Sequence, residues 1–98
     1  MYVIIHYFVE NFIEKRKHLR RAHLEYIESY VSKGLVIAGG ALLPNLEKGL
    51  ILFNGTNDEV KAFIRCDPYV ENSIIRSSEV AEWNIVAGKI RQCREVRP

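Results

Sequence analysis

Short apolar segments alternate with two segments of helical periodicity along this chain of 98 residues. The apolar segments are rich in β-branched and aromatic side chains and are bounded by turn-forming residues, which favours strands. The resulting order, strand–helix–strand–strand–helix–strand (βαββαβ), is typical of an α+β, ferredoxin-like fold with an antiparallel sheet and helices on one face. The predicted strands are residues 2–9, 35–43, 49–53 and 77–86, and the predicted helices are residues 11–34 and 58–65.

The longest predicted helix, Asn11 to Gly34, carries a histidine on its apolar face. Asn11 is a helix-capping residue with Glu14 three positions further on, as in a capping box. Gly34 can take the left-handed conformation that ends a helix. His23 projects near the middle of the apolar stripe, where it is either a hydrogen-bonded core residue or a functional group. The stripe consists of Leu19, Ala22, Tyr26, Ile27 and Tyr30.

The second predicted helix has clear end signals. Thr56 or Asn57 can cap its start, and Pro68 is expected to end it near Cys66 or Asp67. One more helical turn is predicted over residues 69–72.

Two glycines, Gly39 and Gly40, lie inside the second predicted strand. A glycine pair in a strand marks either a bulge or a close approach by another group. It is no dinucleotide fingerprint, because a third glycine and a following helix pattern are missing.

Composition excludes several classes of function. The net charge of +2 is too small to indicate nucleic-acid binding by itself, so a nucleic-acid partner is not expected. Residues 89–98 are polar and basic and are predicted to form a loose tail, with anion binding through it as a weaker alternative.

No apolar run approaches the roughly 20 residues of a membrane span. No positive segment precedes the first apolar run, so the prediction is a cytoplasmic protein without a signal peptide.

Neither the cysteines nor the histidines form a metal-binding pattern. Cys66 and Cys93 lie far apart and match no metal spacing, so two reduced thiols are expected. His6, His18 and His23 are not spaced to bind a metal on one helix face. We therefore expect neither a metal nor a cofactor.

The first three predicted strands are continuously apolar. A ferredoxin-like fold covers one sheet face with helices and leaves the other bare, and a large bare apolar face is unusual on a monomer. Packing against the sheet of a second copy would cover it. We therefore expect a homodimer.

An ordered set of motifs extends from the long helix to the last strand. The motifs are Arg20-x-x-His23-Leu24, Ile37-Ala38-Gly39-Gly40-Ala41-Leu42 and Asp67-Pro68-Tyr69-Val70, followed by Trp83 in the last predicted strand. Over residues 1–88 this set resembles the YCII-related family of small dimeric α+β barrel proteins. The family often has proline where this chain has Ala41, and residues 89–98 lie outside the resemblance.

The resemblance implies a ferredoxin-like domain over residues 1–88, sheet-to-sheet dimers and a cleft between the first helix and the strands. It also implies an active site on a His and Asp pair, which corresponds to His23 and Asp67 here. Relatives include a dehalogenase that acts on chlorinated muconolactones.

A histidine paired with a carboxylate is an acid–base unit, because the carboxylate sets the imidazole tautomer and stabilises its protonated form. Such a unit can remove a proton beside a carbonyl group and start an isomerisation or an elimination. The function predicted is a lyase or isomerase acting on a small oxo-acid or lactone-like substrate. The alternative is a non-catalytic ligand-binding or interaction module on the same fold.

Four further residues are candidates for substrate binding, each with a structural alternative. Arg20 could hold a substrate carboxylate or lie at the surface. Tyr69 could hydrogen-bond a ligand or fill the core. Gly39 and Gly40 could admit a ligand to the backbone or form a plain bulge. Asp67 itself could simply cap a turn before Pro68.

Overall fold

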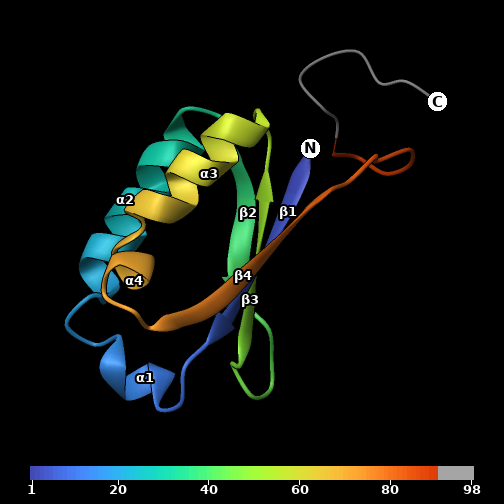
Figure 1. Ribbon diagram of the computed structural model, residues 1–98. Coiled ribbons are helices and arrows are strands. Elements are labelled where there is room, and N and C mark those ends of the chain that lie inside the picture. Colours follow the sequence, from blue (N-terminus) through green and yellow to red (C-terminus); the bar gives the residue numbers. More distant parts are fainter. Residues whose placement is uncertain (91–98) are drawn as a thin grey trace.

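The computed structural model describes residues 1–90 as a four-stranded antiparallel sheet with helices packed on one face (Figure 1). The strand order is β2-β3-β1-β4, which confirms the predicted ferredoxin-like α+β fold. No helix of this part of the chain is long and apolar enough to cross a membrane. The elements are β1 (Tyr2–Phe8), α1 (Phe12–Lys15), α2 (Arg20–Ser32), β2 (Val36–Ala41), β3 (Lys48–Phe53), α3 (Asn57–Cys66), α4 (Pro68–Glu71) and β4 (Ile75–Glu82).

Alternation along β1 and β3 determines what each sheet face carries. Ile4 pairs with Ile51 and Tyr2 with Phe53, and these side chains point toward the helices. Ile5 follows Ile4 on β1 and pairs with Leu50, so it points to the opposite face of the sheet. Figure 1 shows α2, α3 and α4 on the first face, where the main core lies. That core consists of Ile4, Val36, Ile51, Phe53, Val60 and Phe63.

The prediction of one helix from Asn11 to Gly34 is wrong, because the chain breaks between α1 and α2. Asn11 has a left-handed backbone, φ 58°, and its side chain makes no capping hydrogen bond. Phe12 is buried, stacked at 3.8 Å on the Phe8 ring, and this contact holds α1 beside the end of β1. The backbone N–H of Leu19 then bonds the carbonyl of Arg16, a tight turn that redirects the chain before α2. Gly34 ends α2 at φ 79°, as predicted.

The apolar stripe of α2 is mostly as predicted. Tyr26, Ile27 and Tyr30 are half-buried and pack against the main core, whereas Ala22 is exposed and does not belong to the stripe. The Tyr26 hydroxyl donates a 2.7 Å hydrogen bond to the carbonyl of Phe63, which ties α2 to α3.

The second helix follows its end signals closely. Thr56 caps α3 through a capping box with Glu59, and α3 ends at Cys66. Asp67 is the N-cap of α4, and Pro68 occupies its first turn, where a missing N–H costs nothing. The junction between the two helices therefore holds Asp67 in an extended conformation, φ −67° and ψ 127°.

The last strand is shorter than predicted. It ends at Glu82, so Trp83 lies just outside it, with its backbone N–H bonded to the carbonyl of Met1. Ile85 is buried against Met1 and Leu52 on the face opposite the helices. Most of the predicted tail, including Cys93, lies outside the described residues.

Candidate active site

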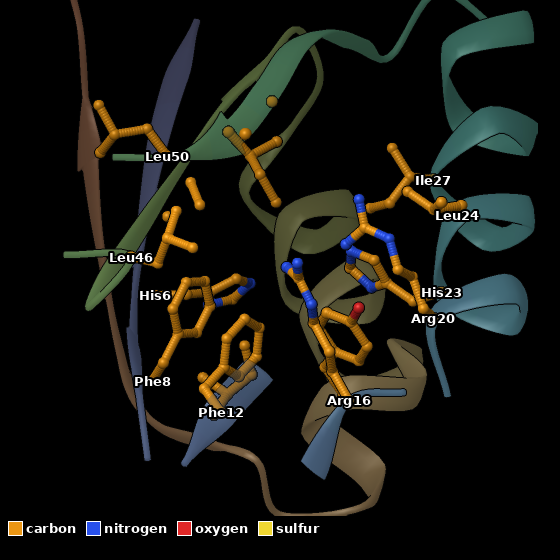
Figure 2. A pocket seen from close by; sticks show the side chains of 17 residues that line it. His6, Phe8, Phe12, Arg16, Arg20, His23, Leu24, Ile27, Leu46 and Leu50 are labelled. Carbon is orange, nitrogen blue, oxygen red and sulfur yellow. The ribbon is translucent and has the colours of Figure 1, made fainter. Parts of the chain in front are cut away.

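A pocket of about 330 Å³ lies between α2 and the sheet (Figure 2). His23 and Arg20 come from α2, His6 from β1, and Gly39 and Gly40 from β2. The predicted cleft between the first helix and the strands is therefore present. The residues that line it are far apart in the sequence.

His23 lines the pocket and makes the predicted contact with Asp67, which is buried and does not line the pocket. His23 Nδ1 lies 2.8 Å from Asp67 Oδ1, and the two side chains are 14% and 0% exposed. The same carboxylate oxygen accepts the backbone N–H of Tyr69 at 2.9 Å, because Asp67 caps α4. Since a carboxylate can only accept, Nδ1 carries the hydrogen and Nε2 of a neutral His23 keeps a free lone pair for proton transfer.

Tyr69 fixes the orientation of the His23 ring. The two rings stack with 3.7 Å between their centroids and 3° between their planes, and Phe12 packs edge-on against Tyr69. The Tyr69 hydroxyl is buried, and the neighbouring Arg20 guanidinium can only donate to it, so the hydroxyl hydrogen has no acceptor among residues 1–90. Burial raises the pKa of Tyr69, and the nearby Arg16 and Arg20 guanidinium groups oppose this shift. The hydroxyl is therefore neutral at physiological pH and can donate to a bound ligand.

Arg16 and Arg20 give the pocket its positive charge. Figure 2 shows both side chains extending into the space that His23 and His6 border. Arginine suits carboxylates and other anionic oxygens, because its guanidinium group can donate two parallel hydrogen bonds. Of the two arginines, only Arg20 was predicted from the sequence to bind a substrate.

Gly39 and Gly40 both line the pocket, but neither is at the bulge. The register of β2 against β3 shifts between Val36 and Ala38, ahead of the pair. A Cβ on Gly39 would lie 3.3 Å from Ile51 Cγ1, whereas one on Gly40 would meet nothing within 4 Å. The sequence left two alternatives for the glycine pair, a bulge or a close approach by another group. The structure fits the close approach better, because the pair lines the pocket and the bulge lies elsewhere.

Sequence reasoning missed His6 as a pocket residue. Its side chain is 3% exposed, Nδ1 lies 2.7 Å from Ser78 Oγ, and Nε2 has no hydrogen-bond partner among the described residues. The signal that could have revealed it is the alternation of β1, which places His6 on the same face as Ile4 and Phe8. A polar side chain in that position points toward the helices.

The stability of the protein should depend on pH through His6. Burial lowers the pKa of His6 below its ordinary 6.5; Asp67 raises it and His23 lowers it by smaller amounts. Below pH 6.5, His6 binds a proton in the unfolded chain but not in the folded chain. The free energy of unfolding therefore falls as the pH decreases from 6.5 toward the pKa of His6 in the folded protein.

Urea unfolding of the wild type and of His6→Leu checks this prediction. Between about pH 7 and about pH 5.5 the wild type should lose more stability than the variant, because only the wild type carries this linkage. The two proteins share every other titratable group, so the difference isolates His6. Equal pH dependence in the two proteins would contradict the prediction.

No group of three or more His, Cys, Asp or Glu side chains within residues 1–90 is arranged to hold a metal ion. Cys66, next to Asp67, is exposed and not in a disulfide.

Comparisons with known proteins agree with this architecture. The family model described as the YCII-related domain matches residues 1–84. A similar solved structure is that of the 5-chloro-2-hydroxyhydroquinone dehydrochlorinase TftG from Burkholderia phenoliruptrix AC1100, in complex with 2,5-dihydroxybenzoquinone. The two chains are 21% identical, with a TM-score of 0.74 over 84% of this chain and 91% of that one, which establishes a shared fold. No sequence among the curated proteins matches the chain.

Proposed function

We propose an enzymatic role for this chain, which belongs to the YCII-related domain family. In this proposal His23 is a general base that removes a proton next to a carbonyl group of a small anionic oxo-acid or lactone-like substrate. Asp67 holds the imidazole and stabilises its protonated form. The reaction is an isomerisation or an elimination.

The observation that carries the proposal is the 2.8 Å contact of His23 with the fully buried Asp67 at the wall of a cationic pocket. A histidine needed only for packing does not require a carboxylate partner and a neighbouring cavity. Dehydrochlorination, the activity named for TftG, is an elimination, and the ligand of that structure carries carbonyl groups on a small ring.

The proposed step can be written with its bond changes. The C–H bond beside the carbonyl breaks, its proton passes to His23 Nε2, and the electron pair forms a carbon–carbon double bond while the carbonyl π electrons move to oxygen. The carbonyl re-forms when the reaction is completed. In an isomerisation the proton returns to another carbon of the substrate, whereas in an elimination a leaving group departs with its electron pair. Arg20 would hold a substrate carboxylate, and the buried Tyr69 hydroxyl would donate its hydrogen to the substrate.

A hydrogen–deuterium exchange assay tests the proposal without knowledge of the natural substrate. Small α-oxo acids and muconolactone-like compounds are incubated with the protein in deuterated water, and loss of the proton next to the carbonyl is followed by NMR. Exchange that requires His23 supports the proposal. A compound that binds in the pocket without exchange by the wild type would favour the alternative, a non-catalytic ligand-binding module.

We also propose that the protein is a homodimer through the sheet face opposite the helices. Ile5 and Leu50 are paired on that face, as are Val3 and Leu52. Within residues 1–90, the cover on this face lies at the end near Leu52, where Met1 and Ile85 pack. A second copy would remove the remaining apolar surface from water.

Analytical ultracentrifugation at micromolar concentration checks the dimer. The wild type should sediment with twice the chain mass of 11.3 kDa. Ile5→Lys should sediment as a monomer, because burying an unpaired charge between two sheets is unfavourable. A folded wild-type monomer at these concentrations would contradict the proposal.

A further inference from the structure

We propose that His6 is a second catalytic group, whose neutral Nε2–H donates a hydrogen bond to the substrate carbonyl oxygen while His23 removes the neighbouring proton. The inference rests on the proposed function. It adds the group that stabilises the negative charge on the substrate oxygen. It also requires the substrate to bind with its carbonyl oxygen toward β1 and its acidic C–H toward α2.

The first argument is the unsatisfied nitrogen. His6 is 3% exposed and lines the pocket, yet Nε2 has no hydrogen-bond partner among the described residues. Buried polar atoms of side chains are nearly always hydrogen-bonded, because an unpaired one loses its interaction with water without compensation. A ligand oxygen in the pocket would supply the missing partner.

The second argument is the tautomer. Ser78 Oγ lies 2.7 Å from Nδ1 and can donate its hydroxyl hydrogen to it, which leaves the ring hydrogen on Nε2. Burial lowers the pKa of His6, so the ring is neutral at physiological pH and serves as a hydrogen-bond donor rather than as a base.

The third argument is that the two histidines lie where they can act on different atoms of one substrate. His6 projects from β1 and His23 from α2, on opposite sides of the same pocket (Figure 2). When His23 takes the proton, the C–H electron pair forms the new double bond and the carbonyl π electrons move to oxygen. The charge that develops there meets the Nε2–H of His6, a donor already in place before the reaction. No proton leaves His6, so the step balances with His23 as the only proton acceptor.

Nitrogen NMR of the free protein provides the first test. A long-range proton–nitrogen spectrum at neutral pH should show His6 as a neutral ring with its hydrogen on Nε2. The hydrogen on Nδ1, or a charged ring, would overturn the inference, because Nε2 would then be an acceptor or the ring an acid.

Substitution provides the second test, with exchange of the substrate proton as the readout. His6→Leu should lower the exchange rate constant by about 100- to 1,000-fold, the usual effect of losing a donor to a developing oxyanion. His6→Gln, which keeps an N–H donor, should recover part of the rate. The matched control is His18→Leu, which removes an exposed histidine outside the pocket and should exchange at the wild-type rate.

Stability separates a catalytic role from a structural one. If His6 serves catalysis, His6→Leu should unfold at the same or a higher urea concentration, since it removes a buried polar atom without a partner. A clear loss of stability together with unchanged exchange would mean that the bond to Ser78 is its only role, and the inference would be overturned.

Binding of 2,5-dihydroxybenzoquinone, the ligand of the similar TftG structure, distinguishes failure of this inference from failure of the proposed function. On saturation with this probe, the nitrogen signals of both His6 and His23 should shift. A response from His23 alone, with exchange insensitive to His6→Leu, would overturn the role of His6 and leave the proposed function intact. Neither binding nor exchange by the wild type would overturn both.

Discussion

Replacing His23 with glutamine is expected to lower the exchange rate constant by about 100- to 10,000-fold, the usual contribution of a general base. Glutamine keeps an amide donor near Asp67 Oδ1, which His23 Nδ1 contacts at 2.8 Å, but it has no basic nitrogen. The variant should therefore remain folded and keep most of its affinity for the probe quinone. NMR exchange kinetics and urea unfolding measure the two quantities separately.

Asp67→Asn tests the other member of the pair, because it removes the negative charge next to His23. Asparagine keeps an oxygen for the backbone N–H of Tyr69, and its amide nitrogen replaces an oxygen, Oδ2, that has no partner among the described residues. Stability should change little, whereas the rate should fall, because the imidazolium loses its buried counter-charge. Wild-type exchange rates in both variants would show that the His23–Asp67 pair is structural.

Phe63→Ala is expected to lower the free energy of unfolding by about 3–5 kcal/mol, the range for deleting a buried aromatic ring. The Phe63 ring is fully buried and contacts the rings of Tyr26, Tyr30 and Phe53 at centroid distances of 5.5, 4.8 and 5.2 Å. It therefore joins α3 to both α2 and the sheet. Small domains have a total stability of about 5–15 kcal/mol, so the variant should be close to unfolding.

Urea denaturation measures this loss, with Leu43→Ala as the control. Leu43 is 82% exposed, and its truncation should change the free energy of unfolding by less than about 0.5 kcal/mol. If Phe63→Ala cost no more than the control, Phe63 would not hold the two helices and the sheet together.

Local patterns were enough for most of the secondary structure. The apolar β-branched and aromatic run of β1, the cap of α3 at Thr56, and Gly34 at the end of α2 are properties of neighbouring residues. Each could be predicted from a short window of the sequence. The pairing of His23 with Asp67 was anticipated from the family resemblance, because periodicity alone relates no two residues 44 positions apart.

The remaining features depend on contacts between distant segments. The break after α1 follows from the packing of Phe12 on Phe8, which competes with the helical periodicity of its own segment. His6 belongs to the pocket because β1 pairs with β4, which brings Ser78, 72 residues away, to its ring. Hydrophobic periodicity determines which face of an element is buried, but the chemistry of a buried group depends on the atoms that other elements place around it.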